Sequence, residues 1–93
     1  MKKYDAIIKF FKDRNFNVCY DCYDTDGVET VWINATTSKL DLVVIVDADE
    51  YLLRDYHTLD CGGFIDFIDY DDIITRKTQS GILFQIERYI HNI

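Results

Sequence analysis

Apolar and polar residues alternate along this chain with two different periods, which predict where helices and strands lie. At the start, Tyr4, Ile7, Ile8 and Phe11 follow the i, i+3, i+4, i+7 spacing. The opposite face carries charged residues: Lys2, Lys3, Asp5, Lys9 and Lys12. This spacing predicts an amphipathic helix over about residues 3–14. Asn15 is placed to end that helix in the left-handed conformation.

The next segments change to a period of two, which is typical of strands. Residues 16–23 alternate, so that Cys19 and Cys22 are predicted to point to opposite faces of a first strand. A turn at residues 24–27 leads to a second strand at 28–36, with Trp32 on its outer face. Residues 40–46 form a third strand whose Val-Val-Ile-Val run predicts a central or doubly covered position.

The rest of the chain indicates helices. Asp47 or Asp49 is placed to cap a helix that ends before Gly62 and Gly63. The apolar positions assigned to this helix are Leu52, Leu53, Tyr56 and Leu59. Residues 64–68 fit either a helical turn or a short strand.

A final helix is predicted from the aspartates near residue 70 to about His91. Asp69, Asp71 and Asp72 suit its first turn, where carboxylates offset the positive end of the helix dipole. Gly81 costs about 1 kcal/mol within a helix, so a break is expected there. The predicted fold is a single small α+β domain, residues 1–93, with the order α-β-β-β-α-α and a three-stranded antiparallel sheet packed on helices.

Composition supports one folded domain. The chain has 93 residues, of which 48% are hydrophobic, so it can bury a core without disulfides and is not expected to be disordered. No apolar run is long enough to cross a bilayer, and the first residues are too charged for a secretory signal. Three cysteines, an odd number, fit free thiols in a reducing compartment, so a cytoplasmic protein is expected.

Charge is concentrated in one segment. The chain carries a net charge of −7, and residues 41–72 contain ten carboxylates with Arg54 as the one Lys or Arg cation. Direct binding to nucleic acid or to an anionic membrane is therefore not expected. Carboxylates this close together repel one another and destabilise a compact domain, so a function is expected to account for them. They could serve solubility, bind a cation or bind a basic partner.

Metal and catalytic motifs are incomplete. Cys19 and Cys22, with His57 and Cys61, have the ligand types and spacing of a zinc site, but the first pair alternates across a strand, so no metal is predicted. The Asp-x-Asp pairs at 24–26 and 47–49 lack the rest of a calcium loop. No nucleophile lies in a histidine context and no pocket motif is present, so a non-enzymatic protein without a cofactor is predicted.

The acidic residues can instead act as a surface. Carboxylates at i and i+2 on a strand lie about 6.6 Å apart, and those at i and i+3 on a helix about 5–6 Å apart, spacings of the order of those between phosphates. Such an array can occupy arginines and lysines that otherwise hold nucleic acid. The expected partner-binding residues are Asp47, Asp49, Glu50, Asp60, Asp66, Asp69, Asp71 and Asp72. The alternative is a small adaptor domain, monomeric or dimeric through Trp32 or the final helix, whose acid serves solubility; a zinc-stabilised domain is a third hypothesis.

Residues 5–18 also carry a resemblance. Their pattern, Asp5-x-Ile7-Ile8-x-x-Phe11-Lys12-x-x-Asn15-Phe16-x-Val18, followed by the predicted order of elements, resembles small phage-encoded anti-CRISPR proteins of the type II-A class. The resemblance implies an acidic αβββαα domain that blocks the PAM-reading site of a CRISPR nuclease. It transfers no functional residue by position, so the expected sites depend on charge alone. The predicted function is an acidic nucleic-acid mimic that inhibits a basic DNA- or RNA-binding protein.

Overall fold

Five strands and two helices make up the computed structural model, which describes residues 4–60 and 66–92, without the side chains of residues 25, 57–60 and 66–68. In chain order the elements are α1 (Asp5–Asp13), β1 (Asn17–Thr25), β2 (Val28–Thr36), β3 (Asp41–Val46), β4 (Tyr51–Asp60), β5 (Asp66–Arg76) and α2 (Gln79–His91). The protein is α+β, as predicted, but the predicted order α-β-β-β-α-α and the three-stranded sheet are wrong. The helix predicted after Asp49 and the start of the predicted final helix form β4 and β5 instead, whereas the end of that final helix is observed as α2.

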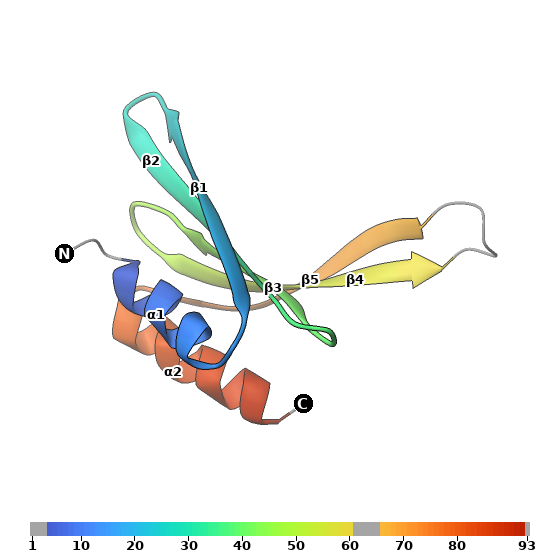
Figure 1. Ribbon diagram of the computed structural model, residues 1–93. Coiled ribbons are helices and arrows are strands. Elements are labelled where there is room, and N and C mark those ends of the chain that lie inside the picture. Colours follow the sequence, from blue (N-terminus) through green and yellow to red (C-terminus); the bar gives the residue numbers. More distant parts are fainter. Residues whose placement is uncertain (1–3, 61–65, 93) are drawn as a thin grey trace.

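All five strands form one antiparallel sheet in the order β1-β2-β3-β4-β5, so each strand pairs with its neighbours in sequence. Both helices lie against the same face of this sheet, as Figure 1 shows. The central position of β3 confirms the prediction drawn from its Val-Val-Ile-Val run. We call the sheet face that packs on α1 and α2 the helix face, and the opposite one the open face.

The core lies between the helix face and the two helices. Its fully buried side chains come from both layers, because strand residues alternate between faces and one stripe of each helix is apolar. The largest are Ile7, Phe11, Val31, Ile33, Leu42, Val44, Val46, Leu53, Ile82 and Ile86. Trp32 lies on the open face, as predicted.

The sequence of β4 does not alternate between apolar and polar residues, because each face of the strand carries both kinds of side chain. Leu53 is fully buried on the helix face and Leu52 is half-buried on the open face. A carboxylate, Asp55, lies on the helix face, and an aromatic ring, Tyr56, lies on the open face. The spacing of the two leucines and Tyr56 therefore imitates one face of a helix.

A β-bulge explains the irregular pattern of β5. Leu53 pairs with Ile74 and Arg54 pairs with Asp72, which leaves Ile73 as the extra residue. Both isoleucines pack against the core. Asp71, opposite Asp55, therefore lies on the helix face, and Asp72 lies on the open face. The aspartates expected in the first turn of a helix are strand residues.

The final helix begins later than predicted. Thr78 caps α2, and its hydroxyl oxygen accepts a hydrogen bond from the backbone N–H of Gly81 at 3.0 Å. A Cβ on Gly81 would lie 2.9 Å from that hydroxyl, so glycine fits the first turn, and the helix does not break there. Two turn predictions are confirmed: Asn15 has φ 64° after α1, and the turn between β1 and β2 has φ 54° at Asp26 and 81° at Gly27.

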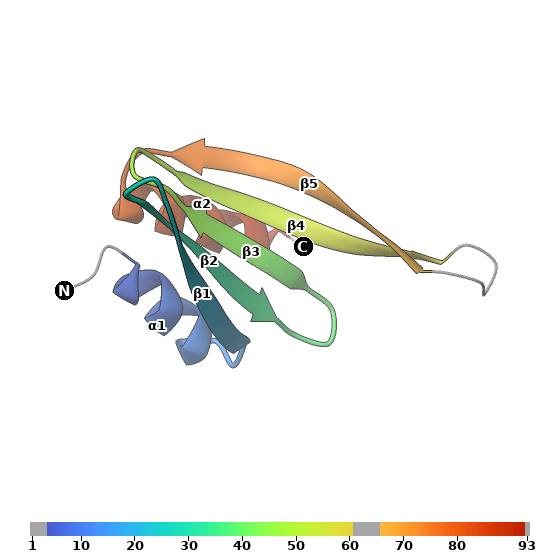
Figure 2. The ribbon, with the colours of Figure 1, turned by 90° about the horizontal axis from the view of Figure 1, so that it is seen from above.

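The last two strands extend beyond the rest of the sheet. β3 pairs with β4 only as far as Asp55, whereas β4 and β5 remain paired to Asp60 and Asp66. Residues 56–60 and 66–70 thus form a two-stranded ribbon that projects from the body (Figures 1 and 2). We call this segment the ribbon.

Substitution of the two leucines of β4 tests the strand assignment. Leu53→Ala is expected to lower the free energy of unfolding by about 2–5 kcal/mol, because it empties a fully buried site. Leu52→Ala, on the open face, should cost less than half as much. Denaturant unfolding measures both; equal large losses would indicate that both leucines face the core, as in the predicted helix.

Candidate functional site

The open face carries the residues best suited to binding. Among the described residues no helix or strand packs on it (Figure 2). The pairing of its strands places aromatic and charged residues next to one another. Tyr23, Trp32, Tyr56 and Tyr70 lie on this face, together with Arg54 from the middle of β4. Aromatic rings and arginine are enriched where proteins bind one another.

Arg54 is held in a cage of aromatic rings closed by one carboxylate. Its Nε lies 2.6 Å from Oδ1 of Asp72, and its Nη2 lies 3.4 Å from Oδ2 of the same carboxylate. The guanidinium carbon lies 4.0 Å from the ring centre of Tyr70, 5.7 Å from that of Trp32 and 5.9 Å from that of Tyr56. The Arg54 side chain is only 14% exposed. This is a two-point ion pair combined with cation–π stacking.

Arg54 carries its charge inside the cage. The hydrogen bond to Asp72 raises the pKa of the Arg54 guanidinium above its ordinary value, and the hydrogen bond to the Tyr56 hydroxyl adds to this, while burial opposes both. Its positive charge is therefore compensated within the chain. Asp72, one of the expected partner-binding residues, is already engaged with a cation.

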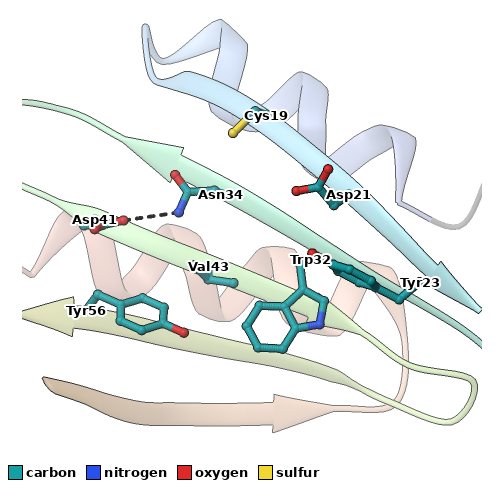
Figure 3. A pocket seen from close by; sticks show the side chains of 8 residues that line it. All are labelled: Cys19, Asp21, Tyr23, Trp32, Asn34, Asp41, Val43 and Tyr56. Carbon is teal, nitrogen blue, oxygen red and sulfur yellow. Dashed lines mark hydrogen bonds between the residues drawn. The ribbon is translucent and has the colours of Figure 1, made fainter. Parts of the chain in front are cut away.

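Beside Arg54 the open face is hollowed. A shallow depression of about 300 Å³ runs across β1, β2, β3 and β4, and we call it the open-face hollow (Figure 3). Its lining residues are Cys19, Asp21, Tyr23, Trp32, Asn34, Asp41, Val43 and Tyr56. The Asn34 amide donates to Oδ1 of Asp41 at 3.3 Å. Two carboxylates and three aromatic rings line this depression, and none of its lining residues is a lysine or arginine.

A second buried polar contact lies on the helix face. Asp55 is 7% exposed and accepts a hydrogen bond from the hydroxyl of Tyr89 in α2. Burial, followed by this hydrogen bond and the charges of Asp55 and Asp71, raises the pKa of Tyr89 to about 12. The contact satisfies a carboxylate within the apolar layer and ties α2 to β4.

The structure separates the expected partner-binding residues into two groups. Asp47, Asp49 and Glu50 are exposed in the turn between β3 and β4. The other five lie on β4 and β5, and this group ends at the far tip of the ribbon, away from that turn (Figure 1). The first group therefore lies before the start of β4, and the second extends from the middle of β4 to the tip of the ribbon.

The five residues of the second group differ in their surroundings. Asp60 pairs with Asp66 at the end of the ribbon, and their side chains lie outside the described part. Asp69 and Asp71 share one face of β5, and Asp72 lies on the other. The expected helical spacing of Asp69 and Asp72 is therefore wrong.

The cysteine pair has the predicted alternation. Cys19 lines the open-face hollow, whereas the thiol of Cys22 lies 3.8 Å from the hydroxyl oxygen of Tyr4 beside α1. Both are free thiols. The side chain of His57 and all of Cys61 fall outside the described residues, and within those residues no three potential ligands are grouped for a metal ion. None of the described helices has the length and apolar character needed to span a membrane.

Comparison with protein-family models, curated proteins and solved structures finds no match. The candidate site is therefore defined by its own geometry. Sequence reasoning singled out Trp32 but missed Arg54 and Asp21. One signal for Arg54 was present: it is the one Lys or Arg among ten carboxylates in residues 41–72.

The Tyr89 contact predicts a loss of stability at high pH. Because the folded-state pKa of Tyr89, about 12, lies above the ordinary value of 10.0, the folded chain holds this proton more tightly than the unfolded chain. The resulting stabilisation is complete below pH 10 and is lost as the pH rises to about 12. Tyr89→Phe should cost about 1–3 kcal/mol at pH 7, since Asp55 loses this donor.

The difference in unfolding free energy between wild type and Tyr89→Phe should shrink between pH 10 and 12. Denaturant titrations at several pH values measure it. A difference that stays constant across this range would contradict the assigned role of the hydroxyl.

The Arg54 cage predicts coupling between Arg54 and Asp72. In a double-mutant cycle with Arg54→Met and Asp72→Asn, the interaction energy should be about 0.5–3 kcal/mol, because the pair is mostly shielded from water on its arginine side. Exposed pairs couple more weakly. The exposed pair Lys9 and Asp13, 2.6 Å apart, serves as a control with Lys9→Met and Asp13→Asn. Equal coupling in the two pairs would contradict the cage.

Proposed function

We propose that this protein is a non-enzymatic acidic inhibitor that occupies the basic groove of a nucleic-acid-processing protein in place of DNA or RNA. The observation that carries the proposal is the ribbon, which projects from the body and carries Asp60, Asp66 and Asp69, with Asp71 and Asp72 next to its base. An RNA-guided nuclease is one member of this class of partner. The predicted order of elements behind the anti-CRISPR resemblance is not observed, so the proposal depends on charge and shape.

The register of the ribbon supports an array of charges. Asp60 stands opposite Asp66 at the tip, His57 stands opposite Asp69, and Asp71 follows at the base of the ribbon. Along β5, Asp69 and Asp71 are two residues apart, which corresponds to about 6.6–6.8 Å. A narrow projecting element with carboxylates at such intervals can enter a groove and meet cations that otherwise contact phosphates.

The base of the ribbon supplies apolar contacts. The ring centres of Tyr56 and Tyr70 are 5.6 Å apart on adjacent strands, and Tyr70 is 47% exposed. Aromatic side chains beside charged groups give an interface binding energy that charge alone does not supply. They favour recognition of a protein over a purely solubilising role for the acid.

The adaptor hypothesis remains the second candidate, favoured by the exposed aromatic side chains of the open face. The two hypotheses differ in their dependence on charge. An inhibitor that replaces nucleic acid must compete with it and must weaken steeply with salt, because both ligands use the same cations. An adaptor need do neither.

The test begins with immobilised protein and a bacterial lysate, from which bound proteins are eluted with duplex DNA and identified. Each purified candidate is then titrated with wild type and with the variant Asp60→Asn, Asp66→Asn, Asp69→Asn. Affinity for the candidate should fall about tenfold or more in this variant, because interface cations lose their carboxylates. Addition of duplex DNA should displace the wild-type protein.

A matched control removes three charges at the other end of the sheet: Asp24→Asn, Asp26→Asn and Glu29→Gln, all exposed. It has the same net charge as the ribbon variant and should bind within about threefold of wild type, because exposed charges away from a contact act through screened, long-range fields. Equal losses in both variants, or binding that DNA does not compete, would overturn the proposal.

A further inference from the structure

We infer that the open-face hollow is a binding site for an arginine side chain of a partner protein. In this site the guanidinium stacks on Trp32 and Tyr23 and donates hydrogen bonds to Asp21. The inference rests on the proposed function only in that a basic partner supplies the arginine. The hollow and the ribbon share Tyr56 but carry different carboxylates, Asp21 in the hollow and Asp60, Asp66 and Asp69 on the ribbon, so the two proposals can be tested separately.

Arg54 shows how a guanidinium group can bind to this face. It lies on the same face, bonded to one carboxylate and stacked on aromatic rings, one of which is Trp32. The open-face hollow has the same ingredients, including Trp32 and Tyr56 themselves, and no cation among its lining residues. The residues that line the hollow are therefore suited to bind a second guanidinium group.

Asp21 is the carboxylate best placed to bind it. Asp21 stands directly opposite Trp32 across β1 and β2, and Tyr23 is the next residue of β1 on the same face. Figure 3 shows the Asp21 carboxylate on the same side of the hollow as these two rings. Within the described part of the chain, Asp21 makes no hydrogen bond or ion pair, so its charge is available.

Asp41 has a different role. By strand geometry its Cα lies roughly 16 Å from that of Asp21, two strands across and four residues along, so one guanidinium cannot bind both. Its Oδ1 already accepts the Asn34 amide at 3.3 Å. Asp41 instead adds negative potential at the far end of the hollow, which favours a basic segment over an isolated charge.

The size of the hollow fits a side chain. About 300 Å³ is at the lower end of ligand pockets, too small for a nucleotide-sized ligand with full burial. Arginine fits better than lysine, because its planar group stacks on rings and donates to a carboxylate at the same time. The occupant we propose is therefore an arginine from a basic protein segment.

Trp32 makes the proposal directly testable, because it is the only tryptophan in the chain. The probe is a blocked peptide, Gly-Gly-Arg-Gly-Gly, added to the full-length protein while tryptophan fluorescence is recorded. A saturable change with a dissociation constant on the order of millimolar is expected for one such contact. The same peptide with citrulline, which has the shape of arginine without its charge, should bind about tenfold or more weakly.

The variant Asp21→Asn keeps the shape of the hollow and removes its available charge. It should weaken the arginine peptide about tenfold. Glu29→Gln is the matched control, since it makes the same charge change on the same hairpin but lies on the other face. It should bind the peptide as wild type does.

Four results would overturn the inference: no saturable change, equal binding of the citrulline peptide, equal effects of Asp21→Asn and Glu29→Gln, or tighter binding of a trimethyl-lysine peptide. The last result would assign the hollow to quaternary ammonium groups. Loss of partner binding in the ribbon variant with intact peptide binding would support this site and the ribbon as independent contacts. Peptide binding that persists when no DNA-competed partner is found would leave this site established and overturn only the proposed function.

Discussion

The structure depends on the packing of two helices on one face of an antiparallel sheet. Ile7 and Phe11 of α1 and Ile82 and Ile86 of α2 are fully buried, and they meet the fully buried residues of β2, β3 and β4. Because side chains alternate along each strand, this packing fixes the register of every strand against the helices. A shift of one residue would bring the charged and aromatic residues of the open face into the core. The core therefore determines the composition of the surface that remains.

Two consecutive charged residues of β4 lie on opposite faces of the sheet because of this constraint. Arg54 lies on the open face and Asp55 on the helix face, so each must be stabilised by a different neighbour. Arg54 is paired with Asp72 and stacked on Tyr70, whereas Asp55 accepts a hydrogen bond from the hydroxyl of Tyr89. In both cases hydrogen bonds compensate a side chain that has little contact with water, as is required of any buried polar group. They also tie the last two strands and α2 to the sheet by specific contacts.

The first half of the fold could be predicted from sequence because its periods are clear. Helix α1, strands β1 to β3, the left-handed Asn15 and the outward position of Trp32 follow from local pattern and turn chemistry. Strands β4 and β5 could not be predicted. In β4, a leucine and a tyrosine on the open face and a carboxylate on the helix face remove the alternation, and in β5 the bulge at Ile73 shifts its phase. These exceptions depend on partners distant in sequence, such as Tyr89 for Asp55, which local pattern does not contain.

The same limit applies to the candidate site. Charge counting located the acidic segment but placed its aspartates on a helix, where Asp69 and Asp72 would share a face. The strand separates them, and the ion pair with Arg54 leaves Asp72 a largely structural role. The open-face hollow could not be predicted at all, because Asp21 and Trp32 meet only through the pairing of β1 with β2, and Tyr56 joins them from β4.

The position of carboxylates on the ribbon also has an energetic reason. Like charges brought together in a compact body repel one another and reduce stability. On a two-stranded ribbon with water on several sides, repulsion is screened within about 8–10 Å at physiological salt, and the core is little affected. The chain thus places Asp60, Asp66 and Asp69 where the folded state tolerates their charge. The open face next to the ribbon carries exposed aromatic side chains, which under the proposed function would convert long-range attraction into a defined contact. In the proposed function, charge on the ribbon and rings on the open face act at different distances on the same class of basic partner.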